Sequence, residues 1–104
     1  MELTKNTLLE CVNKQGGVLH LDEAYEYFAS ISMKYDSYQS FKGSVRGVFE
    51  QNTNLFCNLK KGSGIYALKK YTFLKPLAAH LLEVEDKDKY EVASLCKNII
   101  KNNL

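Results

Sequence analysis

Two pairs of basic residues are the side chains of this 104-residue chain best suited to chemistry with a polyanion. Lys42 and Arg46 are four residues apart, so a helix would place them on one face. Lys60 and Lys61 are adjacent and are followed at once by Gly62-Ser63-Gly64, a composition typical of a turn. Lysine and arginine bind phosphate, and arginine also makes paired hydrogen bonds to guanine. The two pairs therefore predict contact with nucleic acid.

Basic residues are concentrated in the middle of the chain. Between residues 37 and 82 there are seven lysines and arginines and one acidic residue, Glu50. Acidic residues outnumber basic ones in both flanks, by six to three in residues 1–36 and by five to four in residues 83–104. Phosphate neutralisation supplies most of the affinity of non-specific nucleic-acid binding, so this distribution favours a polyanion on one face. A lysine-rich solvated surface is the alternative.

Residues suited to catalysis or metal binding are sparse. His20 and His80 are far apart and neither lies near a nucleophile motif, and a lone histidine beside a strand is expected at the surface or at an edge. Three cysteines without a CxxC pair predict small buried residues rather than a zinc site or disulfides; they are Cys11, Cys57 and Cys96. We expect a non-enzyme with no catalytic residue, no metal, no cofactor and no small-molecule ligand.

The chain contains no stretch near the roughly 20 apolar residues of a membrane span, and its first residues lack a signal-peptide pattern. We therefore expect a cytoplasmic, intracellular protein with no membrane partner. A hydrophobic content of 45% in 104 residues is enough for one modest core.

The first 36 residues predict two short helices around one strand. Thr4 is expected to cap a first helix, which ends just before Gly16-Gly17 because glycine favours the left-handed stop. Residues 18–20 predict a small strand. Asp22 is expected to cap a second helix that runs to about Ser30.

A third helix and a hairpin are predicted next. After a polar joint at residues 32–36, Asp36 or Ser37 can cap a helix running to about Gln51. Its apolar stripe consists of Phe41, Val45, Val48 and Phe49. Its opposite face carries Gln39, Lys42, Gly43, Arg46 and Glu50. Two runs rich in strand formers, residues 55–59 and 65–68, flank the basic turn and predict a hairpin.

The C-terminal third predicts a helical extension. Pro76 suits the first turn of a new helix, and a last helix is expected from about Lys87 to Asn102. The apolar face of that helix consists of Val92, Leu95, Cys96, Ile99 and Ile100. This face needs a partner, which is either the first helix of the same chain or its twin in a homodimer. The predicted organisation is a domain of residues 1–71 and an extension of residues 72–104.

Four segments carry a likeness to known domains. They are a polar-capped first helix ending in Gly16-Gly17, then Leu19-x-Leu21-x-x-Ala24-Tyr25, Val45-Arg46-Gly47-Val48-Phe49 and Gly64-Ile65-Tyr66-Ala67-Leu68-Lys69. With these, residues 3–70 resemble the winged helix-turn-helix domains of the helicase-and-restriction-endonuclease-associated group. The resemblance implies an α+β, mainly α fold with three helices and a small antiparallel β-hairpin wing. The likeness ends at Lys70, and the C-terminal helical extension lies beyond it. It also implies a part in transcription regulation or in a restriction or mobile-element system.

The resemblance implies binding of double-stranded DNA, with the third helix in the major groove and the wing on the phosphate backbone. The matching positions are Tyr38, Gln39, Lys42, Gly43 and Arg46 on the helix, and Lys60, Lys61 and Ser63 at the wing. Each has an alternative structural role. Arg46 could pair with Glu50, Tyr38 could cover the edge of the core, and the two wing lysines could be solubilising charges.

Two other functions stay open on the sequence. A protein-interaction module would use the last helix together with Tyr25, Tyr27 and Tyr38, with nucleic acid playing no part. Binding of RNA would use exposed tyrosines that stack on bases.

Overall fold

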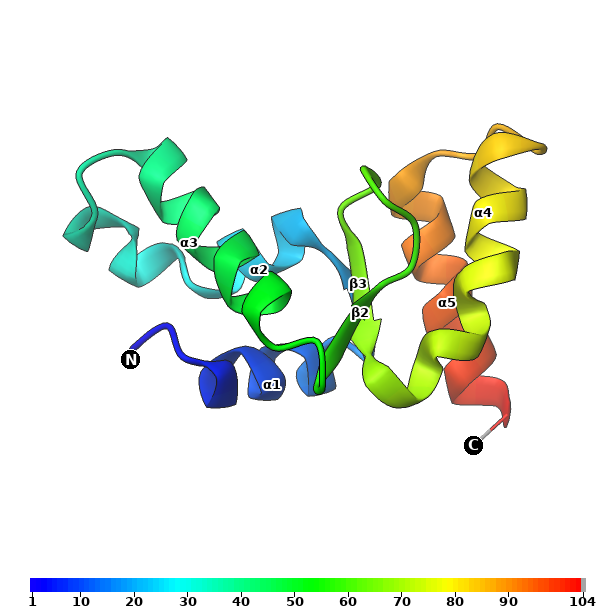
Figure 1. Ribbon diagram of the computed structural model, residues 1–104, viewed down its shortest axis with the longest axis horizontal. Helices are drawn as coiled ribbons and strands as arrows, with labels where there is room; N and C mark the ends of the chain where they lie inside the picture. The colour runs from blue at the N-terminus through cyan, green and yellow to red at the C-terminus, as the bar shows by residue number, and fades with distance from the viewer. Residues whose placement is uncertain (104) are drawn as a thin grey trace.

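The computed structural model describes residues 1–103 as a mostly helical α+β fold around one small sheet (Figure 1). In chain order the elements are α1 (Lys5–Lys14), β1 (Val18–His20), α2 (Leu21–Tyr27), the 3₁₀ helix η1 (Ala29–Lys34), α3 (Tyr38–Gln51), β2 (Phe56–Asn58), β3 (Ile65–Leu68), the 3₁₀ helix η2 (Lys69–Leu74), α4 (Lys75–Glu83) and α5 (Lys89–Asn103). In Figure 1, α1, α2 and α3 lie on one side of the β2–β3 hairpin and α4 and α5 on the other.

The sheet has three antiparallel strands with β3 in the centre. Leu19 of β1 pairs with Tyr66 of β3, and Cys57 of β2 pairs with Ala67 of β3. The two predicted hairpin strands are therefore confirmed, and the short strand β1 joins them as a third. β1 is too short to be stable alone, and its pairing with β3 satisfies its backbone groups.

The predicted ends of α1 and α3 are confirmed. The Thr4 side chain accepts a hydrogen bond from the backbone of Thr7 and caps α1, and Ser37 caps α3 in the same way through Ser40. Gly16 and Gly17, which follow α1, have φ of 97° and 93°, a region that favours glycine. These ends were predictable because a cap depends on residues close together in sequence.

The start and the end of α2 differ from the prediction. His20, not Asp22, is the N-cap, and its imidazole Nδ1 accepts a hydrogen bond from the Asp22 backbone while the Glu23 carboxylate accepts one from the His20 backbone. The helix begins one residue before Asp22, directly after β1. It ends at Tyr27, and η1 covers the last residues of the predicted helix and the first half of the expected polar joint, with Ile31 buried in the core.

The C-terminal extension packs against the rest of the chain. Helix α5 lies on β1 and also contacts α4, and α5 begins at Lys89 because Asp88 caps it through the backbone of Tyr90. Val92, Cys96 and Ile100 are buried, whereas Leu95 and Ile99 are half-buried. Most of the apolar face is thus covered within the chain, mainly by β1 and α4 rather than by the first helix. A homodimer through α5 would have to use what is left of it.

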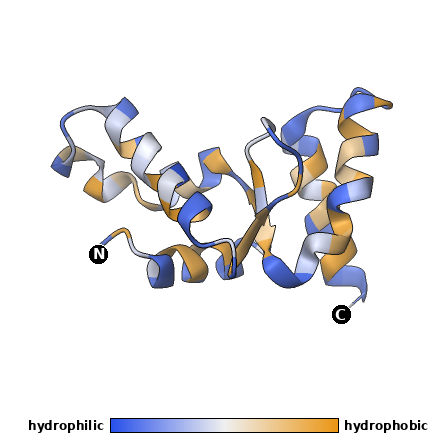
Figure 2. Cartoon of the chain, viewed as in Figure 1, coloured by the Kyte–Doolittle hydropathy of each residue, from blue (hydrophilic) through white to orange (hydrophobic). Residues whose placement is uncertain are grey.

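Hydrophobic segments gather in the strands and along the inner faces of the helices (Figure 2). The three cysteines belong to this core, as predicted, and burial raises the pKa of the Cys11 thiol to about 12. No helix within residues 1–103 is long and apolar enough to cross a membrane.

Candidate nucleic-acid interface

A groove of about 530 Å³ lies between α3 and the turn that joins β2 to β3, residues 59–64. We call it the α3–turn groove. Its charged lining consists of Lys42, Arg46, Lys61 and Lys89 against Asp22 and Glu50; its other lining residues are His20, Leu21, Tyr25, Asn58, Gly62, Ser63, Gly64 and Tyr66. None of the four cations forms an ion pair with any residue from 1 to 103. The groove therefore has more positive than negative side chains in its lining, and its cations are not ion-paired within the described residues.

Arg46 is held by a tyrosine from α2. Its Nη1 donates a hydrogen bond of 3.1 Å to the hydroxyl of Tyr25, and the Tyr25 ring is buried against Phe41. The predicted alternative, an ion pair with Glu50, does not form within the described chain. One end of the guanidinium is thus fixed by a neutral partner, and the charge stays available to an anion in the groove.

Lys42 lies one turn before Arg46 and is positioned by two aromatic rings. Its ammonium is 5.6 Å from the centre of the Tyr25 ring and 5.4 Å from that of Tyr38, distances at which a cation is attracted to an aromatic face. Tyr38 is 55% exposed at the first turn of α3, and Gln39 beside it is also exposed. Both side chains are therefore accessible to a partner.

The outward face of α3 has room at Gly43. A Cβ added there would meet only the Arg46 side chain, at an ordinary contact distance of 3.7 Å. Internal packing therefore does not require glycine at this position, although glycine in a helix costs about 1 kcal/mol relative to alanine. The open space leaves room for a partner to approach the backbone of α3 closely at Gly43.

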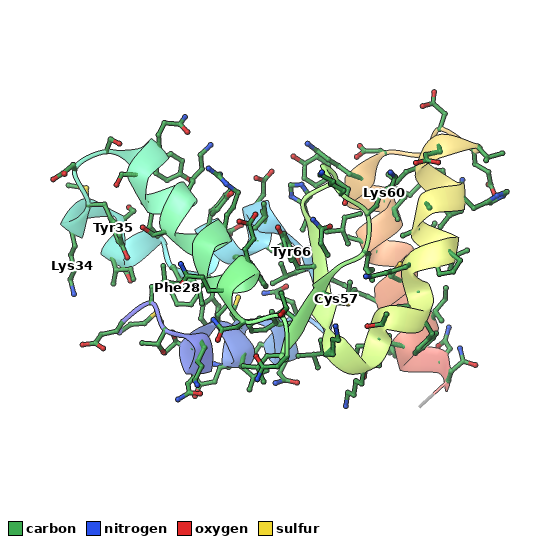
Figure 3. All side chains as sticks on the ribbon, in the orientation of Figure 1. Phe28, Lys34, Tyr35, Cys57, Lys60 and Tyr66 are labelled. Atoms are coloured by element: carbon green, nitrogen blue, oxygen red, sulfur yellow. The ribbon has the colours of Figure 1, made fainter. Side chains whose placement is uncertain are left out.

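The two adjacent lysines of the β2–β3 turn have different surroundings. The Lys60 ammonium lies 2.7 Å from a carboxylate oxygen of Glu83 in α4, and Figure 3 shows Lys60 on the side of the hairpin that faces α4. Lys61 is exposed and lines the groove. Of the two lysines predicted at the wing, only Lys61 lines the groove, and Lys60 is paired with Glu83.

Ser63 stabilises the turn. Its hydroxyl donates to the carbonyl of Lys60 at 2.6 Å and accepts from the backbone of Ile65 at 3.1 Å. The hydroxyl is therefore engaged within the turn even though Ser63 lines the groove.

His20 is the main residue that the sequence prediction misplaced. His20 lies on the edge strand β1, but it is only 5% exposed because α5 covers it, with the Tyr90 ring 4.6 Å away. The Tyr90 hydroxyl donates to the Asp22 carboxylate at 2.6 Å. Lys89 and Tyr90 are about 70 residues from His20 in the chain, so no local pattern could have placed them beside it.

Burial lowers the pKa of His20 below its ordinary value of 6.5, with Lys89 acting in the same direction and the Asp22 and Glu23 carboxylates opposing it. The unfolded chain takes up a proton near pH 6.5, whereas the folded chain does so only at lower pH. Stability is therefore expected to fall as the pH drops from about 6.5 toward the lowered pKa. Urea unfolding at a series of pH values should show this loss, and His20→Asn should reduce it. An unchanged pH dependence in that variant would contradict the assignment.

No group of three or more histidine, cysteine, aspartate or glutamate side chains within residues 1–103 is placed to hold a metal ion. Comparisons with protein-family models, with curated proteins and with solved structures gave no match to this chain. The chemistry of the α3–turn groove is that of a cationic surface lined with aromatic rings and hydrogen-bond donors, and nucleic acid has the complementary chemistry.

Proposed function

We propose that this protein binds double-stranded DNA as a winged-helix module, with α3 in the major groove and the β2–β3 turn as the wing. The observation that carries the proposal is the convergence of Lys42, Arg46, Lys61 and Lys89 on one groove without carboxylate partners in the described chain. These cations come from α3, from the β2–β3 turn and from α5. Unpaired cations gathered by tertiary structure repel one another, and a polyanion relieves that repulsion.

Different side chains are proposed to do different work. Arg46, held by Tyr25, is the residue suited to paired hydrogen bonds with guanine, and Gln39 is suited to adenine. Lys42 and Lys61 are point charges suited to phosphate. The order of α3 followed at once by an antiparallel hairpin supports the winged-helix arrangement. A regulatory or nuclease-associated role and a cytoplasmic location are part of the same proposal.

Most of the residues that a protein-interaction module would use are not exposed. Tyr25 is buried and Tyr27 is half-buried, and most of the apolar face of α5 is covered by the chain itself. Single-stranded nucleic acid is the second candidate, because the exposed ring of Tyr38 could stack on an unpaired base.

Salt dependence is the experiment that tests the function. Each phosphate neutralised on a duplex contributes about −0.9 to the slope of log affinity against log salt. Three or four groove cations therefore predict a slope near −3, measured by fluorescence anisotropy with a labelled duplex. Failure to bind any duplex at about 50 mM salt would exclude duplex DNA as the ligand. Tighter binding to the single strand would favour the second candidate.

The adjacent lysines supply a matched pair of variants. Lys61→Gln should make the salt slope less negative by about 1, because one phosphate contact is lost. Lys60→Gln should leave the slope unchanged, because Lys60 is paired with Glu83. The fold should also be kept, because an exposed ion pair of this kind contributes at most about 1 kcal/mol to stability. Equal effects of the two changes would show that the wing does not contact DNA through Lys61 in the proposed way.

A further inference from the structure

His20 provides a hydrogen-bond donor in the lining of the α3–turn groove. Because its Nδ1 accepts the Asp22 backbone N–H at 3.0 Å, the proton of the neutral ring is on Nε2. No group within residues 1–103 accepts a hydrogen bond from Nε2. Within the same residues, every fully buried side-chain nitrogen or oxygen has a hydrogen-bond partner. Nε2 must therefore reach solvent, and His20 lines the groove.

The β2–β3 turn leaves Nε2 uncovered because residue 64 is glycine. A Cβ on Gly64 would lie 2.9 Å from Nε2, and its φ of 75° also disfavours any other residue. The backbone of Leu21 donates to the Gly64 carbonyl at 2.9 Å, which holds the turn beside the imidazole. The turn and the histidine therefore lie side by side in the lining of the groove, and the glycine leaves Nε2 accessible.

The groove around Nε2 offers more donors than acceptors. Lys61 and Lys89 line it and form no ion pair within residues 1–103, and the Lys89 ammonium lies 5.5 Å from the centre of the Tyr90 ring. Arg46 and Lys42 add positive charge on the α3 wall. Of the two carboxylates that line the groove, Asp22 accepts a hydrogen bond from Tyr90, and Glu50 lies on α3. Such an arrangement suits an anion with several acceptor oxygens close together, which is the chemistry of a phosphate group.

We propose that the groove holds a phosphate subsite formed by His20 Nε2–H, Lys61 and Lys89. The proposal rests on the proposed function for its natural ligand, a phosphate of the nucleic-acid backbone, and it extends the interface to α5 through Lys89. A free phosphate monoester has the same chemistry. Inorganic phosphate and a nucleoside monophosphate therefore serve as probes that do not require duplex binding.

The first test is a titration of the full chain with sodium phosphate, followed by NMR of the imidazole and backbone nitrogens at constant ionic strength. Saturable shifts are expected at His20 Nε2 and at the amides of Gly62 and Gly64. The same titration with sodium chloride is the control. Shifts that are absent, or that chloride reproduces, would overturn the subsite.

His20→Asn is the sharpest variant, because asparagine is a good N-cap and so replaces Nδ1 while removing the Nε2 donor. Phosphate affinity should fall by roughly tenfold, since hydrogen bonds to charged groups are strong ones. His80→Asn, on the exposed side of α4, should bind phosphate as the unaltered chain does. Wild-type affinity in a folded His20→Asn chain would overturn the proposal.

Lys89→Gln keeps the test decisive if His20→Asn fails to fold, because Lys89 is exposed. Lys89→Gln should weaken phosphate binding severalfold. Lys87→Gln is the matched control, because Lys87 is only two residues from Lys89 in the chain but is paired with Glu91, and it should leave phosphate binding unchanged. If the unaltered chain binds phosphate but no duplex, the proposed function is rejected and the subsite stands. If the chain binds the duplex but neither His20→Asn nor Lys89→Gln changes the phosphate-induced shifts, the subsite is rejected and the proposed function stands. A nucleoside monophosphate that outcompetes the duplex would identify a free monoester as the ligand.

Discussion

Gly17→Ala is expected to lower the free energy of unfolding by about 3 kcal/mol, because an added Cβ meets a closer neighbour at Gly17 than at any other glycine. Gly17 has φ of 93°, and an added Cβ would lie 2.6 Å from Cε2 of the buried Tyr71 ring. The substitution therefore combines backbone strain with a steric clash in the core. Tyr71 belongs to η2, so the clash would push the α1–β1 connection away from η2. Urea denaturation measures the loss.

Gly16→Ala is the matched control. Its φ is 97°, close to that of Gly17, but an added Cβ would meet only the flexible Lys97 side chain at 3.7 Å. This variant should lose only the backbone component, about 1 to 2 kcal/mol. The difference between the two variants isolates the clash with Tyr71. Equal losses would mean that the Tyr71 ring can move away at little cost.

Arg46→Ala is expected to reduce affinity for duplex DNA by about 100-fold while leaving the fold intact. The guanidinium is held by the Tyr25 hydroxyl at 3.1 Å, so it is already oriented before the partner arrives. Arg46→Lys should recover little, because lysine lacks the planar fork that makes paired hydrogen bonds. Titration of a labelled duplex, with circular dichroism to confirm the fold, measures the effect.

Two further variants separate charge from orientation. Tyr25→Phe removes the hydroxyl that holds Arg46 but keeps the buried ring, and we expect an intermediate loss of affinity. Lys34→Ala removes an exposed positive charge in η1, outside the residues that line the groove, and should change affinity less than twofold. If Arg46→Ala bound as tightly as the unaltered chain, the proposed role of α3 would be wrong.

The sequence by itself determined the features that depend on neighbouring residues. The capping of α1 by Thr4 and of α3 by Ser37, the stop at Gly16-Gly17 and the β2–β3 hairpin were all predicted, because caps and turns are formed within a few residues. The apolar stripe of α3 was predicted from its period, and Phe41, Val45 and Phe49 are buried.

Only the tertiary structure decided which charges share a surface. Lys60 and Lys61 are neighbours in sequence, yet Glu83 holds the first while the second lines the groove. His20 caps α2 and becomes buried because Tyr90 packs on it from a distant helix. Lys89 reaches the groove because α5 docks on β1. Contacts of this kind follow from how the apolar faces of separate elements pack together, and a periodic pattern shows that a face exists without showing what covers it.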